Sequence, residues 1–186
     1  MVSKKEFAQA LRKLLDSGFR FTVIGGSVVE LELGSRDLGD DIDLFAEAPS
    51  PVIEEEEYYR VAEENGWVIG QTWLGTPRVI VRVDQAEVPV EFYDNIYDFY
   101  VPEEILRDAR KIRVSGVTVR AVRVEDHIVL KANAGRRSDM ERLQEIARLV
   151  KKGKLQVDVK RIQWAAELFD DRKGILNRLR SAGFKV

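Results

Sequence analysis

The sequence predicts an α+β (α/β) fold, in which a mixed, mostly antiparallel sheet is flanked by helices and followed by a helical C-terminal part. Short apolar runs with strand-like alternation occur only before about residue 122. Stretches with helical spacing of apolar residues precede and separate these runs, and only helical spacing follows residue 123. We therefore expect a core at residues 1–122 and a helical region at residues 123–186 packed on it.

The composition is that of one compact soluble domain or a domain with a small appendage. The chain has 186 residues, of which 45% are hydrophobic and 33% charged, with a formal net charge of −2. No apolar run reaches the roughly 20 residues of a membrane span, and the N-terminus lacks a secretion signal, so we expect a cytoplasmic protein without a membrane partner. The absence of cysteine excludes disulfides, thiolate metal sites and a cysteine nucleophile. High charge and few methionines also fit a thermophilic source.

The first elements are a helix, a strand, a short helix and a second strand. Ser3 and Glu6 form a predicted capping box for a helix that ends at Gly18. A strand at residues 20–24 follows, Ser27 starts a short helix that ends at Gly34, and residues 41–46 form the next strand.

Residues 50–122 alternate between predicted helices and strands. Ser50-Pro51 predicts a helix start, with the helix running to about Gly66. Strands at residues 67–72, 78–83 and 87–93 should pair in consecutive antiparallel order, and Pro89 indicates an edge position or an irregular ladder. A short helix from Pro102 to about residue 110 precedes a hairpin of residues 112–114 and 117–122.

The helical part begins at residue 124, and Ser138 with Glu141 predicts a capping box for its second helix. The last 36 residues contain ten Lys or Arg residues against four acids. Such a basic segment can mark a nucleic-acid surface, and the alternative interpretation is a set of solvated helix faces.

The residues that carry chemistry lie at the ends of the first two strands. Gly25-Gly26 follows a strand, where a backbone without Cβ atoms can approach a phosphate. Asp41 and Asp43 are spaced at i and i+2 on a strand, so both point to one face and can hold a divalent cation. A phosphate cradle beside a metal clamp indicates phosphoryl-group chemistry.

Metal-dependent phosphoryl transfer needs a third carboxylate near the first two. Glu91 is the first candidate, because it lies between Val90 and Phe92 and so faces away from the core. Asp94, just past the strand, is the second candidate, and Glu87, nearer the turn, is the third.

Together these residues resemble a known signature. The signature of the nucleotidyltransferase fold, the DNA polymerase β-like superfamily, is similar. In this chain the matching residues are Gly25-Gly26-Ser27, then after thirteen residues Asp41-Ile42-Asp43, and later Val90-Glu91-Phe92. The stretch from Val124 to Asp139 resembles the minimal prokaryotic branch that includes the AbiEii-type toxins and uncharacterised nucleotidyltransferase-like proteins.

The resemblance implies a role for each matching residue. Gly26 and Ser27, with Gly25 beside them, would hold the triphosphate of a nucleotide. Asp41, Asp43 and Glu91 would be the catalytic acids and the ligands of two Mg²⁺ (or Mn²⁺) ions. The later-helix lysine and the aspartate after it map to Lys131 and Asp139, and Arg136 could add bidentate phosphate contacts. Relatives often carry Arg-x-Thr before the first aspartate, whereas this chain has Arg36-Asp37-Leu38, one residue farther away and without the threonine.

We therefore expect a magnesium-dependent nucleotidyltransferase that moves a nucleoside monophosphate from an NTP such as ATP to an acceptor hydroxyl. By resemblance, the acceptor is an RNA or tRNA end or a protein, and a toxin-like role with an antitoxin partner is implied. One alternative is a catalytically inert nucleotide- or partner-binding module of the same fold. Another is a small-molecule enzyme that modifies an antibiotic-type hydroxyl.

Overall fold

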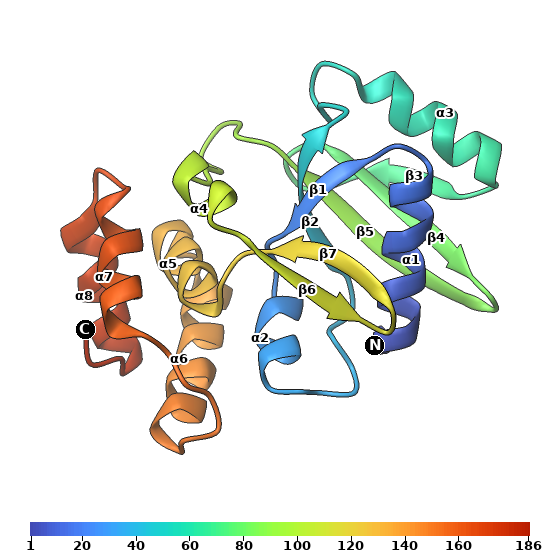
Figure 1. Cartoon of the computed structure of the whole chain (residues 1–186). Helices are drawn as coiled ribbons and strands as arrows, with labels where there is room; N and C mark the ends of the chain where they lie inside the picture. Colours follow the sequence, from blue (N-terminus) through green and yellow to red (C-terminus); the bar gives the residue numbers. More distant parts are fainter. The chain divides into compact units, whose positions relative to one another are not determined.

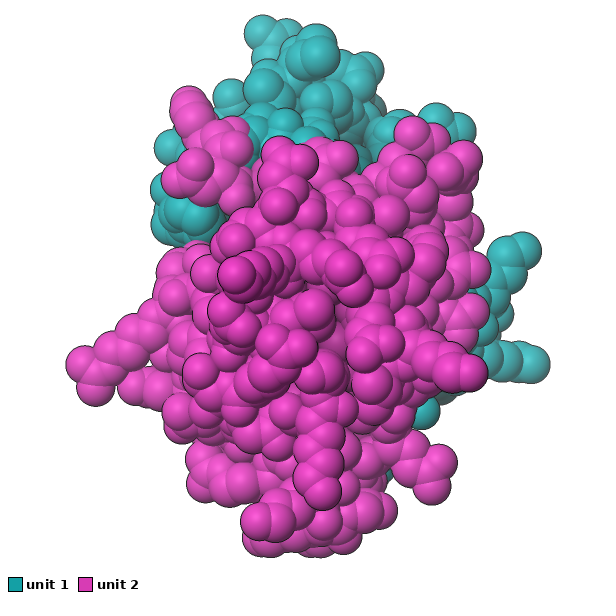
Figure 2. Space-filling model, turned by 90° about the vertical axis from the view of Figure 1, so that its left-hand side faces the viewer, with its two compact units in different colours: residues 1–96, 109–122 teal, residues 97–108, 123–186 magenta.

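A computed structural model describes residues 1–186. The chain forms two compact units, coloured separately in Figure 2: unit 1 contains residues 1–96 and 109–122, and unit 2 contains residues 97–108 and 123–186. Unit 1 carries the sheet and unit 2 is helical. The short segment 97–108, which the sequence analysis assigned to the core, belongs to the helical unit.

Unit 1 is built on a seven-stranded sheet with the strand order β3-β4-β5-β2-β1-β7-β6 (Figure 1). Its strands and helices are, in chain order, α1 (Lys4–Asp16), β1 (Arg20–Val23), α2 (Ser27–Glu32), β2 (Ile42–Ala48), α3 (Glu55–Asn65), β3 (Val68–Gln71), β4 (Pro77–Val83), β5 (Ala86–Tyr93), β6 (Arg110–Val114) and β7 (Val117–Ala121). Neighbouring strands are antiparallel except for the pairs β1–β7 and β2–β5. The expected mixed, mostly antiparallel sheet is thus confirmed.

In the parallel pair β2–β5, one face of the sheet is apolar and buried. Ile42 is the register partner of Val90, and Leu44 that of Phe92, and all four side chains are fully buried. The residues between them point to the other face, because side chains alternate along a strand. Pro89 lies one residue before this pairing begins, where β5 pairs with β4 alone, so its missing N–H costs no bond to β2.

Helices cover the apolar face of unit 1. The amphipathic α1 packs across β4, β5, β6 and β7. The ring of Tyr58 on α3 lies 4.8 Å from that of Phe92 and 4.9 Å from that of Phe19, which follows α1. This aromatic cluster fixes α3 on the Phe92 face, so polar residues that alternate with Phe92 leave from the opposite face.

Unit 2 consists of five helices: α4 (Glu103–Arg107), α5 (Val124–Ala134), α6 (Arg137–Lys151), α7 (Val159–Glu167) and α8 (Arg172–Ala182). Arg161 on α7 connects three of them, because its guanidinium binds Asp126 on α5 at 2.8 Å and Asp108 after α4 at 2.6 Å. Its guanidinium carbon also lies 3.9 Å from the ring centre of Trp164. The fully buried Asp126 is therefore paired, as a buried carboxylate must be.

Two predicted helix starts are wrong. α3 begins at Glu55 and not at Pro51, because the Ser50 side-chain oxygen accepts hydrogen bonds from the amides of Val52 and Ile53 and closes a turn there. α6 begins at Arg137, so Ser138 lies inside the helix, and the carboxylate of Glu141 pairs with Arg137 at 3.0 Å instead of closing a capping box.

Candidate active site

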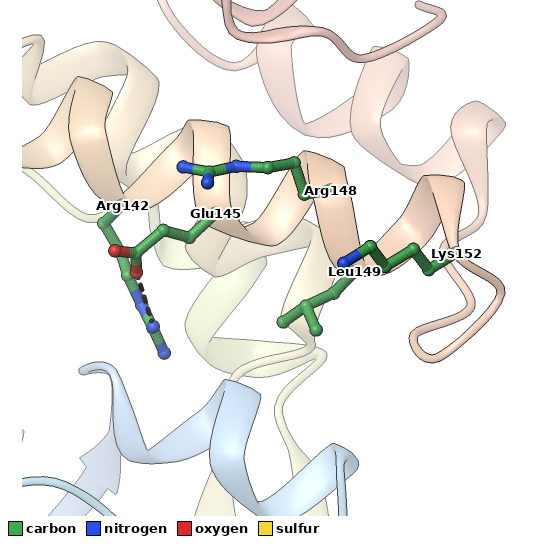
Figure 3. Close-up of a pocket in the computed structure, with 5 residues that line it drawn as sticks. All are labelled: Arg142, Glu145, Arg148, Leu149 and Lys152. Atoms are coloured by element: carbon green, nitrogen blue, oxygen red, sulfur yellow. Dashed lines mark hydrogen bonds and ion pairs between the residues drawn. The ribbon is translucent and has the colours of Figure 1, made fainter.

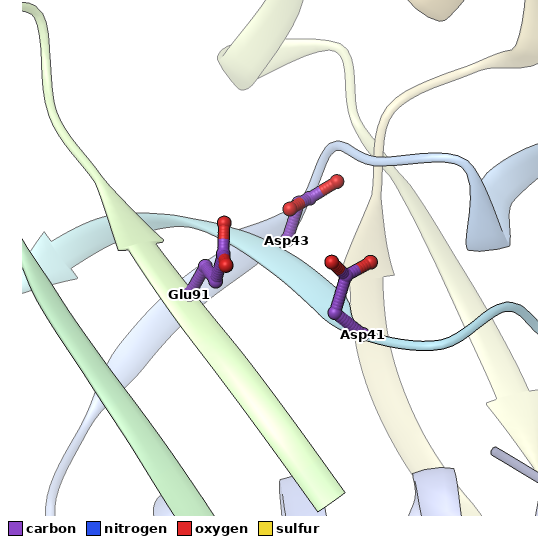
Figure 4. A group of neighbouring side chains, drawn as sticks. All are labelled: Asp41, Asp43 and Glu91. Atoms are coloured by element: carbon purple, nitrogen blue, oxygen red, sulfur yellow. The ribbon is translucent and has the colours of Figure 1, made fainter. Parts of the chain in front are cut away.

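Three carboxylates gather on the polar face of the sheet in unit 1 (Figure 4). Asp43 lies on β2 directly opposite Glu91 on β5, and Asp41 lies just before β2. One oxygen of each of Asp41, Asp43 and Glu91 lies within 4.8 Å of the others. This spacing and this set of oxygen donors are suited to a divalent cation such as Mg²⁺.

The glycine turn after β1 passes directly beside Asp43. The amide of Ile24 donates a hydrogen bond to the Asp43 carbonyl at 3.0 Å. A Cβ atom at position 25 would lie 2.0 Å from the Asp43 carboxylate oxygen Oδ2, so Gly25 is required for this close approach. The Gly25-Gly26-Ser27 turn and the acid cluster are therefore neighbours in space as well as in the sequence motif.

Ser27 and Gly26 differ from Gly25 in their surroundings. A Cβ atom at Gly26 would have no neighbour within 4 Å, so the backbone there borders open space. The Ser27 side chain is 2% exposed, and its hydroxyl oxygen is buried without a hydrogen-bond partner. A buried hydroxyl without a partner costs free energy, which a ligand accepting its hydrogen bond would recover.

Two residues that the sequence analysis missed hold Glu91. Arg78 on β4 is the register partner of Glu91, and its Nε donates to Glu91 Oε1 at 3.0 Å. The hydroxyl of Tyr93 donates a short hydrogen bond to the other oxygen, Oε2. The strand alternation of β4 and β5 places both donors on the acid face, but their pairing with Glu91 depends on a register that a single sequence does not reveal.

The cluster is electrostatically crowded. Burial raises the pKa of the Asp41 carboxyl above its ordinary value, and the nearby Glu91 charge acts in the same direction, while Arg78 opposes both. Burial also raises the pKa of the Tyr93 hydroxyl, as do Asp43 and the hydrogen bond to Glu91. The Tyr93 hydroxyl therefore stays protonated as a donor, and the three acids present negative charge that a metal would compensate.

The other two candidates for the third acid have separate surroundings. Asp94 accepts a hydrogen bond from the Ser50 hydroxyl at 3.2 Å. Glu87 is exposed near the β4–β5 turn, opposite Arg82. Neither belongs to the carboxylate group that Asp41, Asp43 and Glu91 form.

Lys131, Arg136 and Asp139 form a cluster of their own in unit 2. The Asp139 side chain is 2% exposed, and its two oxygens accept from Lys131 Nζ at 2.8 Å and from Arg136 Nε at 2.7 Å. Burial alone would raise the pKa of Asp139, but the hydrogen bonds from Arg136 and Lys131 outweigh it and hold the pKa below its ordinary value. Asp139 is thus an ionised anchor for two cationic side chains.

A surface hollow of about 270 Å³ lies along α6 (Figure 3). It is lined by Arg142, Glu145, Arg148, Leu149 and Lys152. Arg142 is ion-paired with Glu145 at 3.0 Å, which leaves the hollow with a net positive lining.

None of the helices combines the length and apolarity that a membrane crossing requires.

Comparison with family profiles identifies the chain. Residues 3–181 match the family described as "Nucleotidyl transferase of unknown function (DUF2204)". The chain belongs to this family. This nucleotidyltransferase thus carries its acid cluster, its glycine turn and its helical unit inside the matched range. A comparison with curated proteins found no match.

One solved structure has a similar fold. The crystal structure of an antigenic nucleotidyltransferase-like protein from Paracoccidioides brasiliensis is 16% identical, with a TM-score of 0.54 over 97% of this chain and 88% of that chain. The expected nucleotidyltransferase fold is thus confirmed. A crystal structure of ANT(2″)-Ia in complex with adenylyl-2″-tobramycin is 15% identical, with a TM-score of 0.49 over 96% of this chain and 97% of that chain. The tobramycin adduct is a property of that protein.

Proposed function

We propose that this nucleotidyltransferase is a magnesium-dependent enzyme that transfers a nucleoside monophosphate from an NTP to an acceptor hydroxyl and releases pyrophosphate. The observation that carries the proposal is the position of the Asp41–Asp43–Glu91 cluster beside the Gly25-Gly26-Ser27 turn. Phosphate-binding and metal-binding groups are adjacent there, as phosphoryl transfer requires.

The acid cluster fits a divalent metal. Asp41, Asp43 and Glu91 would hold one or two Mg²⁺ ions, and the bound metal would stabilise the negative charge on the reacting phosphates. Gly25 keeps the turn close to Asp43, while the open backbone at Gly26 and the hydroxyl of Ser27 would bind phosphate oxygens. An inert module has no need for three carboxylates that repel one another, which argues against the scaffold alternative.

In the helical unit, we propose phosphate-binding roles for Lys131 and Arg136. Both side chains are held by Asp139, so their positive groups are pre-oriented. The basic hollow on α6 supports a polyanionic acceptor such as an RNA end, because Arg148 and Lys152 can contact phosphates. A protein hydroxyl and an antibiotic-type small molecule are the competing acceptors, and a toxin-like role is the physiological setting that the resemblance favours.

The test is label transfer from each α-phosphate-labelled NTP in the presence of Mg²⁺, with total RNA, protein lysate or a panel of polyhydroxylated antibiotics as separate acceptors. We expect label in the RNA fraction. Asp43→Asn should reduce the rate of label transfer by more than about 100-fold, because loss of a metal ligand should cost more activity than loss of a residue that only hydrogen-bonds to a ligand. Glu87→Gln, with its exposed acid outside the cluster, is the matched control and should keep its activity.

The outcome separates the three alternatives. Label in protein or in a small molecule, and not in RNA, would replace the proposed acceptor but keep the reaction. Transfer that survives unchanged in Asp43→Asn, or that needs no divalent metal, would overturn the proposed active site.

A further inference from the structure

The ion pair between Arg78 and Glu91 has a consequence for metal binding, which rests on the metal-dependent function proposed above. Arg78 Nε lies 3.0 Å from Glu91 Oε1, and the two residues are register partners on β4 and β5. The Glu91 side chain is 16% exposed, whereas that of Arg78 is 40% exposed. Arg78 therefore reaches a proposed metal ligand while its side chain keeps room to move.

Glu91 has its two oxygens occupied differently. Oε1 accepts from the cationic Arg78, and Oε2 accepts from the neutral Tyr93 hydroxyl. Each carboxylate oxygen has two lone pairs, so both donors leave room for a metal in geometry. The charge of Arg78 nevertheless opposes metal binding, because a guanidinium is always protonated and repels a divalent cation bound to the same carboxylate.

We propose that Arg78 is a built-in counter-ion of the Asp41–Asp43–Glu91 cluster, which competes with the divalent metal and weakens its binding until a triphosphate is present. Without a metal, Arg78 compensates part of the charge of three carboxylates that lie within 4.8 Å of one another. With an NTP, the negative phosphates attract both the metal and the guanidinium, so the two cations no longer compete for one set of acids. Metal and nucleotide then bind with positive coupling, because each raises the affinity for the other.

The chain supplies a matched control on the same strand. Arg82 lies four residues after Arg78 on the same face of β4, and it is opposite Glu87 as Arg78 is opposite Glu91. Arg78→Gln and Arg82→Gln therefore remove the same charge from the same strand, and only the first removes it from the acid cluster. Arg78→Lys keeps the charge and tests whether charge or shape matters.

The experiment is a titration with Mn²⁺ followed by electron paramagnetic resonance of the free ion, which needs no turnover. We expect Arg78→Gln to bind Mn²⁺ on the order of tenfold more tightly than the unmodified protein, and Arg78→Lys and Arg82→Gln to bind as it does. Repeating the titration with a non-hydrolysable NTP analogue should show a smaller increase of Mn²⁺ affinity in Arg78→Gln than in the unmodified protein. Circular dichroism checks that each variant is folded.

The direction of the change decides the proposal. A merely structural ion pair would leave metal affinity equal or lower when Arg78 is replaced, so an unchanged or weaker affinity in folded Arg78→Gln overturns it. An equal gain in Arg82→Gln also overturns it, because the effect would then follow net charge alone. Asp43→Asn tests the underlying site separately: Mn²⁺ binding that Asp43→Asn leaves intact overturns the proposed metal site itself, whatever Arg78 does.

Discussion

Asp43 and Glu91 are register partners on adjacent parallel strands, so their side chains leave the same face of the sheet at the same level. The chain brings them together from positions 48 residues apart, and Gly25, in the turn after β1, approaches Asp43 closely. The site is therefore fixed by strand register and does not rely on flexible loops alone.

Glu91 and Glu87 offer a comparison of two acids on one strand. Glu91→Gln should reduce nucleotidyl transfer by more than about 100-fold, because it removes a carboxylate from the proposed metal ligands. Glu87→Gln, on the same face four residues earlier, should stay within about twofold of the unmodified rate. Steady-state rates at saturating Mg²⁺ provide the measurement, and equal rates for both variants would contradict the assignment of Glu91.

Replacement by alanine should destabilise the protein at Gly25 and have almost no effect at Gly26. Gly25→Ala places a methyl group 2.0 Å from Asp43 Oδ2, and we expect the free energy of unfolding to fall by about 1–3 kcal/mol from overpacking. Gly26→Ala meets no atom within 4 Å and should change stability by less than about 0.5 kcal/mol. Urea denaturation compares them. A Gly25→Ala protein as stable as Gly26→Ala would show that the strand end has room to shift.

Ser27→Ala should separate binding from stability. The Ser27 hydroxyl has no partner in the protein, so its removal should leave the free energy of unfolding unchanged or slightly higher. Nucleotide affinity should fall by about fivefold, the value of one hydrogen bond of about 1 kcal/mol. Isothermal titration with a non-hydrolysable NTP gives the affinity. Ser35→Ala is the control, since that hydroxyl donates to Glu30 at 2.7 Å; an equal loss in both variants would exclude a specific phosphate contact by Ser27.

Asp139 should make the helical unit sensitive to acid. Its pKa is lowered in the folded state, so the unfolded state binds protons first as the pH falls. The stabilisation is complete above the unfolded value of about 3.9 and is lost as the pH falls through the folded pKa. Urea midpoints should show Asp139→Asn to be about 1–3 kcal/mol less stable at pH 7, with the difference shrinking toward pH 3.

The exposed Asp170 provides the control for this pH dependence. Asp170→Asn should follow the unmodified protein at every pH. A stability difference for Asp139→Asn that stays constant between pH 7 and pH 3 would mean that the carboxylate charge is not what stabilises the cluster.

Local patterns in the sequence predicted three consecutive antiparallel strands and the choice of Glu91 as the third acid of the candidate site. Glu91 could be proposed because Val90 and Phe92 on either side of it are of core type, and strand alternation then turns the acid outward. It could be ranked first because Glu87, on the same face, lies nearer the turn and Asp94 lies just past the strand. Alternation is a property of one strand and is visible in one sequence. The turns between residues 67–72, 78–83 and 87–93 predicted consecutive antiparallel pairing, and β3, β4 and β5 pair in this way.

These patterns could not predict which residues face each other on neighbouring strands, or which of several local hydrogen bonds a side chain forms. Arg78 reads as an ordinary polar strand residue, and only the β4–β5 register makes it the partner of Glu91. Ser50 has the residue type of a helix cap, yet its side chain closes a turn five residues before α3 begins. The register between strands and the choice among short-range hydrogen bonds depend on the packing of the whole unit. The preferences of single residues carry no information about that packing.

The route of the chain also limits how this protein can be taken apart. The backbone leaves unit 1 after Ile96, returns at Ala109 for the β6–β7 hairpin, and leaves again after Val122. Asp108, at the end of the first excursion, is bound by Arg123 and Arg161 from the second. A fragment beginning at residue 123 would lack α4 and would leave these two arginines without Asp108. A fragment ending at residue 122 would contain α4 without the other helices of unit 2. No single break in the chain yields both units intact: unit 1 alone requires Ile96 to be joined to Ala109, and unit 2 alone requires Asp108 to be joined to Arg123.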